Sequence, residues 1–336
     1  MRFYFFTILY FAIYISACNN TTIDPANAAP VVTLKMQRMD SILFNLDTLH
    51  FDQSVTALKT TYPFVQQVVG EQMLGLDTAH SNEGLIRFIR AYYPIYKEAA
   101  RLNIPTVIHP QIESLFTRVQ FYFPHYTLPK TIIYFIGPLE GYGNTIGEHY
   151  MAIGLQLALG ANSQWYQSEQ IQKIYPPYMS KDFRAEAIPV FAAKNLLQDI
   201  APIDQRQQNL IIQIIEAGKR QYILKKILPT LNDALVFGYS EAQYKGATEE
   251  ESNCWNYILQ MNLLYSKDPT VIRNFLQEGP FNTYFGSEVP SNIGVYIGYQ
   301  IVHAWMKEQS RNGTVDLSVL LSKPAEQLFA ESKYHP

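Results

Sequence analysis

The sequence contains little cysteine and little charge. Two of its 336 residues are cysteine and 16% are charged, with 26 basic and 29 acidic side chains. Two cysteines form at most one disulfide, so stability must come from burial of a hydrophobic core, for which the chain is long enough. The slight acidic excess provides neither the basic face of a nucleic-acid-binding protein nor a polybasic patch for anionic lipid. We therefore expect no nucleic-acid partner.

The motifs of several common enzyme classes are also absent. The sequence contains no HExxH, P-loop, GxGxxG or GxSxG motif, and none of its seven histidines is paired four residues apart. Glu148 and His149 are adjacent beside a predicted strand, where neighbouring side chains point to opposite faces, so we interpret them as a solvated edge. His303, close to Trp305 in an apolar helix, is typical of a core histidine. No metal ligand, cofactor site or catalytic residue is predicted from a motif.

The amino terminus is typical of an export signal. Arg2 precedes an uncharged apolar run at residues 3–15, and two small residues then lead to Cys18. This pattern defines a signal peptide. The apolar run is too short to cross a bilayer, which takes about 20 apolar residues. Residues 15–18 also resemble the bacterial lipobox, so we predict that residues 1–17 are removed and that Cys18 carries lipid. An ordinary signal peptide that contains a cysteine is the alternative.

A tether and a folded domain are predicted to follow. Residues 19–30 are small and polar and include two prolines, so we expect the lipidated cysteine and its flexible tether to span residues 18–30. Residues 31–336 are predicted to form a single domain. With Cys18 lipidated, Cys254 has no cysteine with which to pair. Tyrosine is the commonest aromatic residue, and it suits both half-buried helix faces and protein interfaces.

The apolar pattern predicts an α+β fold that is mostly helical with a small β-sheet. Runs of β-branched and aromatic residues predict strands at 31–34, 130–136 and 150–157, with a turn at 141–144. Apolar residues three and four apart predict helices. These helices are expected at 39–46, at several short stretches within 52–102, and at 111–123, 185–200, 205–228, 249–265, 270–277, 293–307 and 317–331. We expect Asp204 to cap the helix at 205–228, Pro229 to end it, and Pro324 to break the last helix.

The helix at 205–228 contains the first candidate site residue. Glu216 follows two apolar turns, so we expect it to be partly buried and to need a partner. Gly218 costs about 1 kcal/mol relative to alanine inside a helix, which indicates close backbone packing at this point. Glu216 is therefore either a ligand or catalytic acid, or a structural carboxylate bonded to an arginine or a backbone group.

The segment 175–184 contains two further candidates. Its sequence YPPYMSKDFR places aromatic residues, among them Tyr178, and basic residues, among them Arg184, beside two prolines. This composition suits a binding loop, and it equally suits a structural entry into the following helix.

Motifs along the chain together resemble one known family. They are the lipobox, QRMDSILFNLD at 37–47, YFP at 122–124, GYGN at 141–144, IGL at 153–155 with LG at 159–160, YPPY at 175–178 with FR at 183–184, IEAGK at 215–219, LYS at 264–266, EGPF at 278–281 and IGVYIGYQIV at 293–302. In combination they resemble the gliding-motility-associated lipoprotein GldB family of Bacteroidetes, from Cys18 to about Trp305. The resemblance implies a lipid-anchored protein of the cell envelope, at the outer membrane and facing the periplasm. It also implies protein partners in the gliding machinery and the type IX secretion linked to it.

The same motifs are distantly similar to a group of predicted zinc-dependent proteases. In that group one helix carries HExxH and the next carries an EG motif. Here Glu216 and Gly218 stand at the EG position, whereas the preceding helix at 185–200 contains no histidine. A catalytic zinc normally needs three protein ligands, so the resemblance implies a degenerate zincin-like architecture without metal. A cleft beside Glu216, Tyr178 and Arg184 is the candidate groove.

Three functions stay open at this point. The favoured hypothesis is a non-catalytic envelope protein that is held on the membrane by its lipid and binds a protein partner. The alternative is a hydrolase whose site combines dispersed residues such as Glu216, Glu186 and His149. The third is a purely structural envelope protein without a partner in the groove.

Overall fold

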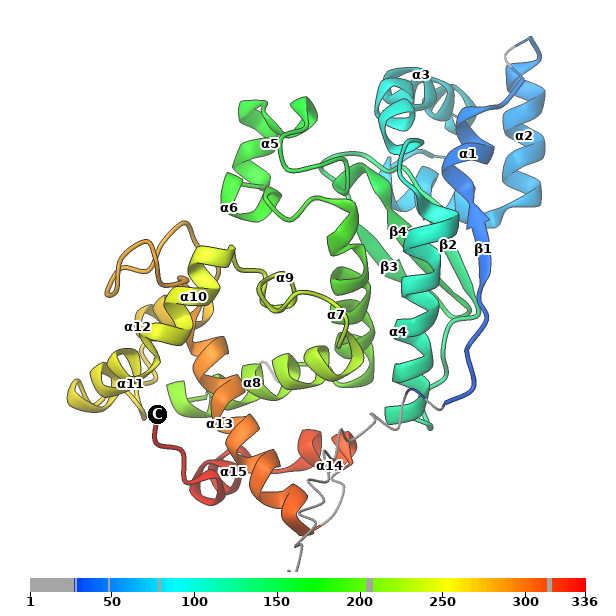
Figure 1. The fold of residues 1–336 in the computed structure, drawn as a ribbon. Coiled ribbons are helices and arrows are strands. Elements are labelled where there is room, and N and C mark those ends of the chain that lie inside the picture. Colours follow the sequence, from blue (N-terminus) through cyan, green and yellow to red (C-terminus); the bar gives the residue numbers. More distant parts are fainter. Residues whose placement is uncertain (1–26, 28, 48, 78–79, 204–207, 313–315) are drawn as a thin grey trace, which may run out of the picture.

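Four strands form one mixed β-sheet (Figure 1). The computed structural model describes residues 27, 29–47, 49–77, 80–203, 208–312 and 316–336. The strands are β1 (Lys35–Arg38), β2 (Thr131–Phe135), β3 (Asn144–Ile146) and β4 (Tyr150–Gly154), in the spatial order β1-β2-β4-β3. β2 is parallel to both β1 and β4, and β3 is antiparallel to β4. β1 and β3 are therefore the two edges of the sheet.

Helices make up most of the rest of the fold. They are α1 (Met39–Phe44), α2 (Phe51–Thr61), η2 (Val65–Met73), α3 (Ser81–Ala99), η3 (Ile104–Ile108), α4 (His109–Tyr122), η4 (Leu155–Leu157), η5 (Gln164–Tyr166), α5 (Glu169–Ile174), α6 (Pro177–Ser180), η6 (Ala185–Ala187), α7 (Ile188–Ile200), α8 (Leu210–Ile227), α9 (Asp233–Phe237), α10 (Glu241–Glu249), α11 (Glu251–Gln260), α12 (Pro269–Leu276), α13 (Ile293–Gln309), η7 (Ser310–Asn312), α14 (Leu317–Ser322) and α15 (Ala325–Ser332). The predicted fold class, α+β and mostly helical with a small sheet, is confirmed. Its degenerate zincin-like character stays a prediction.

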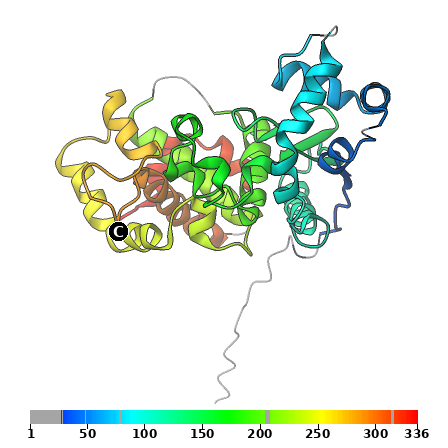
Figure 2. The same cartoon turned by 90° about the horizontal axis from the view of Figure 1, so that it is seen from above.

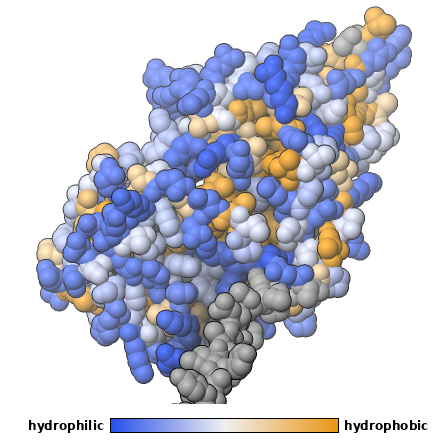
Figure 3. All heavy atoms as spheres, viewed as in Figure 1, coloured by the Kyte–Doolittle hydropathy of each residue, from blue (hydrophilic) through white to orange (hydrophobic). Residues whose placement is uncertain are grey.

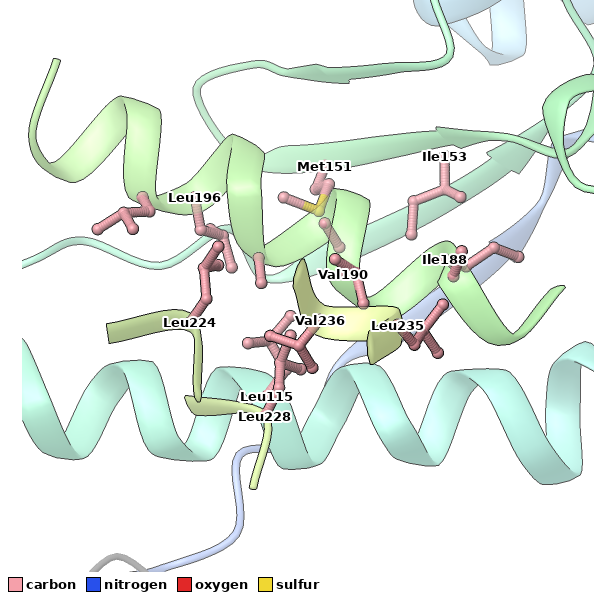
Figure 4. Packing of buried hydrophobic residues seen from close by; sticks show 14 of the residues in the cluster. Leu115, Met151, Ile153, Ile188, Val190, Leu196, Leu224, Leu228, Leu235 and Val236 are labelled. Carbon is pink, nitrogen blue, oxygen red and sulfur yellow. The ribbon is translucent and has the colours of Figure 1, made fainter. Parts of the chain in front are cut away.

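Helices α4 and α7 lie against one face of the sheet (Figures 1 and 4). Figure 4 shows Met151 of β4 near Val190 and Leu196 of α7, with Leu115 of α4 and Val236 of α9 on the other side of α7. All five side chains are buried, and burial of apolar surface stabilises by about 25 cal/mol per Å². Figure 2 places α1–α3 and α10–α12 at opposite ends of the molecule, so the sheet and α7 lie between them.

Helices α8 and α13 cross in close backbone contact. A Cβ added at Gly218 of α8 would lie 2.1 Å from the carbonyl carbon of Gly298 in α13, and one added at Gly298 would lie 1.9 Å from the carbonyl oxygen of Ile214. Side chains other than hydrogen therefore have no room at either glycine. The prediction that Gly218 marks close packing is confirmed.

The strand predicted at 31–34 is wrong, because the first strand begins four residues later. The segment 31–34 is hydrogen-bonded by side chains of α4 and not by a neighbouring strand. The Val32 amide donates to Thr117 Oγ1 at 2.9 Å, and the Leu34 amide donates to Glu113 Oε1 at 2.9 Å. A ring nitrogen of His109 lies 3.2 Å from the Leu34 carbonyl oxygen. These three α4 residues are spaced four apart, so they lie on one side of the helix. From there they form hydrogen bonds with the backbone groups of the extended segment.

Several other predicted elements are confirmed, with shifted ends. The strands predicted at 130–136 and 150–157 are β2 and β4, and the last helix is split at Pro324 into α14 and α15. The residues predicted as a turn at 141–144 end in β3, which the pattern did not predict. Helix α8 ends before Pro229 as expected and begins at Leu210, where the side chain of Asn209 accepts the Ile212 amide.

Two further helical predictions are confirmed with different lengths. The helix predicted at 249–265 is α11, which already ends at Gln260, and a separate helix that the pattern did not predict, α10, precedes it. Within 52–102 the pattern predicts several short helices, and the structure has α2, η2 and α3 there. The last of them is longer than expected, because α3 is one helix of 19 residues that continues through Pro94. A buried apolar stripe along α3 holds it together despite the hydrogen bond that proline removes.

The predictions for the amino terminus fall mostly outside the described residues. These are the signal peptide at 1–17, lipid on Cys18 and all of the tether except residues 27, 29 and 30; the proposed cap Asp204 also lies outside them. Within the described ranges, no helix is long and apolar enough to cross a membrane.

Candidate functional site

A small apolar pocket lies beside the β3 edge of the sheet. Its volume is about 130 Å³, and it is lined by Gly143, Asn144, Ile153, Gly154, Leu157, Ala158, Phe183, Ile188, Phe191 and Asn195. We call it the edge pocket. Figure 3 shows apolar side chains gathered near the middle of the molecule, with hydrophilic side chains around them. The pocket is smaller than the roughly 300–1,000 Å³ of sites for small molecules.

One face of α7 forms a wall of the edge pocket. Ile188, Phe191 and Asn195 are spaced at i, i+3 and i+7, so they lie on the same side of the helix. Pro189 in the first turn does not break α7, because a proline there removes no intrahelical hydrogen bond. Phe191 and Asn195 have the four-residue spacing that two zinc-binding histidines of an HExxH motif would have. At this spacing, α7 presents an aromatic ring and an amide to the pocket.

Close backbone contacts form the opposite wall. A Cβ added at Gly154 would lie 2.4 Å from the carbonyl oxygen of Gly143, so the two chain segments meet as bare backbone. The fully buried side chain of Gln156 supports this wall: it accepts the Gly137 amide at 3.0 Å and donates to the Tyr142 carbonyl at 3.0 Å. These contacts hold the loop that leads into β3, and thereby fix the edge strand beside the pocket.

Two candidate groove residues line pockets other than the edge pocket. Arg184 is in an extended conformation, so Phe183 and Arg184 point in opposite directions, the first toward the edge pocket. Arg184 lines a separate pocket of about 460 Å³ together with Glu186 and Lys181. Tyr178 lines a third, much smaller pocket, which also includes Lys181. The structure therefore places Tyr178 and Arg184 near one another around Lys181, outside the edge pocket.

The third candidate, Glu216, lines none of these pockets. Its side chain is 49% exposed, so about half of it is withdrawn from water, in keeping with the expectation of partial burial. The expected partner exists, but it is Lys219, whose ammonium donates to Glu216 Oε1 at 2.6 Å and to the Lys323 carbonyl at 2.6 Å. Lys219 is the buried member, with 1% of its side chain exposed. Lys219 lies one turn on from Glu216, and its ammonium reaches the chain between α14 and α15 at Lys323.

The residues of the hydrolase hypothesis lie in separate surroundings. Glu186 lines the Arg184 pocket, and Glu216 is bonded to Lys219. The side chain of His149 is 82% exposed beside Glu148, as expected of a solvated edge. The part of the chain that the structure describes contains no group of three His, Cys, Asp or Glu side chains that would hold a metal ion.

His303 is not a core histidine, because it lies on the surface of α13. Its ring is stacked on that of Tyr299 at 5.9 Å and lies 6.4 Å from the ring of Tyr222. Partial burial lowers the pKa of His303, and the nearby ammonium groups of Lys307 and Lys226 lower it further. The helix is apolar on more than one side, so its sequence does not reveal which positions face water.

Comparison with known proteins decides the family. The sequence model of the family described as gliding motility protein GldB matches residues 19–336, which is nearly the whole chain. The chain belongs to the GldB family. Membership makes it a lipoprotein associated with gliding motility and with the cell envelope. No curated protein and no solved structure shows significant similarity to it.

The pocket residues of this GldB-family protein were missed by sequence reasoning. α7 is apolar on most sides, so the pocket-facing stripe of Ile188 and Phe191 is not distinguishable from its buried stripe. The one usable signal was Asn195, which together with Lys194 interrupts the apolar run at 188–197. β3 has only three residues, too few to show an alternating pattern.

Proposed function

We propose that this GldB-family lipoprotein is anchored to the cell envelope through lipid on Cys18 and binds a protein partner of the gliding machinery at the edge pocket, without catalysing a reaction. The observation that carries the proposal is the lining of the edge pocket. It is largely apolar, and its two amide side chains, Asn144 and Asn195, supply hydrogen-bonding groups without charge. Such a lining suits recognition of a side chain of another protein.

The position of the pocket on α7 supports a binding role over a hydrolytic one. Phe191 and Asn195 stand at the spacing at which a zinc hydrolase would place two histidines, and neither is a general acid or base. We expect the anchor to hold the protein on the periplasmic face of the outer membrane. A role in type IX secretion would follow from the same partner if gliding and secretion share it.

Site-specific photo-crosslinking in living, gliding cells tests the proposal. A photoreactive amino acid is placed at Phe191 or at Asn195, and as control at Tyr265, an aromatic side chain that is 70% exposed and lines none of the pockets described above. The proposal predicts one cross-linked protein that is common to positions 191 and 195 and absent from position 265. No specific product at 191 and 195, or the same product at all three positions, contradicts it.

Metal content tests the non-catalytic part of the proposal separately. The protein is purified and dialysed, and bound transition metals are determined per chain. We expect a metal content well below one per chain. About one zinc per chain, retained after dialysis, would contradict this part and direct attention to a hydrolase site. This result would leave the crosslinking result unaffected, so the two parts can fail independently.

A further inference from the structure

The outer edge of β3 carries backbone groups without a partner. In the β3–β4 ladder, Gly143 accepts the amide of Gly154, and the amide of Gly147 donates to Tyr150. Bonded pairs alternate along an antiparallel ladder, so Thr145 also faces β4. The N–H and C=O groups of Asn144 and Ile146 must therefore point outward. Across the described ranges, no hydrogen bond satisfies these outward groups.

The two edges of the sheet differ in charge. β1 carries the exposed Lys35, and a charged side chain on an edge opposes pairing with another strand; its second charged residue, Arg38, is paired with the buried Asp40. β3 reads Asn-Thr-Ile, is partly exposed, and has no charged residue. The chain thus protects one edge of its sheet and leaves the other chemically open to an added strand.

The edge pocket lies beneath the open edge. Side chains alternate along a strand, so Asn144 and Ile146 lie on the same face, and Asn144 lines the pocket. A strand added next to β3 would follow the same alternation and place one of its side chains over the pocket. Cavities of about 150 Å³ hold a molecule the size of benzene, so a pocket of about 130 Å³ matches one apolar side chain.

We propose that an extended segment of the partner protein pairs with the outer edge of β3 as an added strand, and that one of its apolar side chains occupies the edge pocket. The inference rests on the proposed function and gives the chemistry of its partner. The backbone groups of Asn144 and Ile146 provide affinity that is independent of sequence, and the pocket provides selectivity at one position. Because β3 is short, the paired part of the segment is short, and the uncharged lining of the edge pocket favours an uncharged side chain there.

The probe for this inference is a peptide selected from random linear peptides displayed on phage. Selection uses the full-length protein in detergent micelles, and the affinity of the selected peptide is then measured for variants. Ile146→Pro removes the outward N–H and leaves the ladder to β4 intact, and proline is tolerated at a sheet edge. Ile146→Val, which keeps the N–H, is the matched control. We expect Ile146→Pro to weaken binding at least about tenfold and Ile146→Val to change it little.

A second measurement needs no change in the protein. Single N-methyl groups are introduced along the selected peptide. If the peptide adds as a strand, every second position loses binding, because alternate N–H groups face β3. Thermal unfolding of Ile146→Pro shows whether the variant has a folding defect. If it has one, the N-methyl series alone decides whether the peptide binds as an added strand.

The outcomes separate the inference from the proposed function. If Phe191→Glu abolishes peptide binding while Ile146→Pro and N-methylation leave it unchanged, the pocket binds its partner without an added strand and the inference is wrong. Failure to select any peptide overturns it as well. A dimer of the protein that Ile146→Pro dissociates would place a second copy at the edge and also overturn it. Failure of the crosslinking experiment alone counts against the proposed function.

Discussion

At the residue scale, two fully buried charges among the described residues have partners close by in the sequence. The carboxylate of Asp40 is fully buried and accepts two hydrogen bonds from Arg38, at 2.8 and 2.7 Å. Lys219 is equally buried and is bonded to Glu216 three residues away. A buried charge without a partner is costly, so these pairs are requirements of folding. The ion pair with Lys219 is therefore a sufficient structural explanation for a glutamate at position 216.

Replacing Glu216 therefore affects stability and leaves the edge pocket unchanged. In Glu216→Gln the buried ammonium of Lys219 loses its negative partner and keeps the Lys323 carbonyl. We expect a loss of about 1–3 kcal/mol in the free energy of unfolding, measured with urea. Combining it with Lys219→Met should recover most of this loss, because no buried charge remains. A selective loss of motility at unchanged stability would instead give Glu216 a direct role in function.

His303 predicts a pH dependence with a defined sign. Its pKa is lowered in the folded protein, so the unfolded chain binds a proton first as the pH falls. The contribution of neutral His303 to stability is complete above the ordinary pKa of about 6.5 and decreases as the pH falls through this value toward the lowered pKa. The loss of stability from pH 7.5 to 5.5 (both approximate) should be smaller in His303→Gln than in the wild type. If the stability of both proteins falls equally with pH, the stacked ring of His303 tolerates its positive charge.

At the element scale, the crossing of α8 and α13 depends on glycine. The variant Gly218→Ala places a Cβ where the backbone of Gly298 lies, so the helices must separate. We expect a net loss of about 1–3 kcal/mol in the free energy of unfolding, even though alanine favours the helix. Gly70→Ala in η2 is the control, because its Cβ meets only the Val65 carbonyl oxygen at 3.4 Å. Equal unfolding midpoints for the two variants would contradict the close crossing.

Elements were predictable where a local pattern decides them. β2 and β4 are runs of apolar residues of strand length, and α8 ends before a proline, so both can be read from the sequence. The segment 31–34 has a strand-like sequence, but side chains of α4 far away in the chain hydrogen-bond to it. Such contacts between distant segments are not visible in a local pattern, which is why the first strand was misplaced.

At the scale of the whole molecule, the family and the fold class followed from the sequence, but the candidate site did not. The edge pocket exists because α7 packs beneath the free edge of the sheet and brings Phe191 near Asn144. That arrangement is tertiary, and no motif records it. The zincin resemblance directed attention to α7 but placed the groove at Glu216, on the next helix. In the structure Lys219 is the buried member of its ion pair with Glu216, and Glu216 is half exposed.

The central claim is that gliding depends on the edge pocket. The most direct test is the motility of a gliding strain in which the only copy of the protein carries Phe191→Glu, compared with Tyr265→Glu, which places the same charge at an exposed aromatic residue. Both variants must first be shown to be folded and present at wild-type abundance in the envelope. We predict that Phe191→Glu cells do not glide and that Tyr265→Glu cells glide normally. Normal gliding of the Phe191→Glu strain would contradict the account.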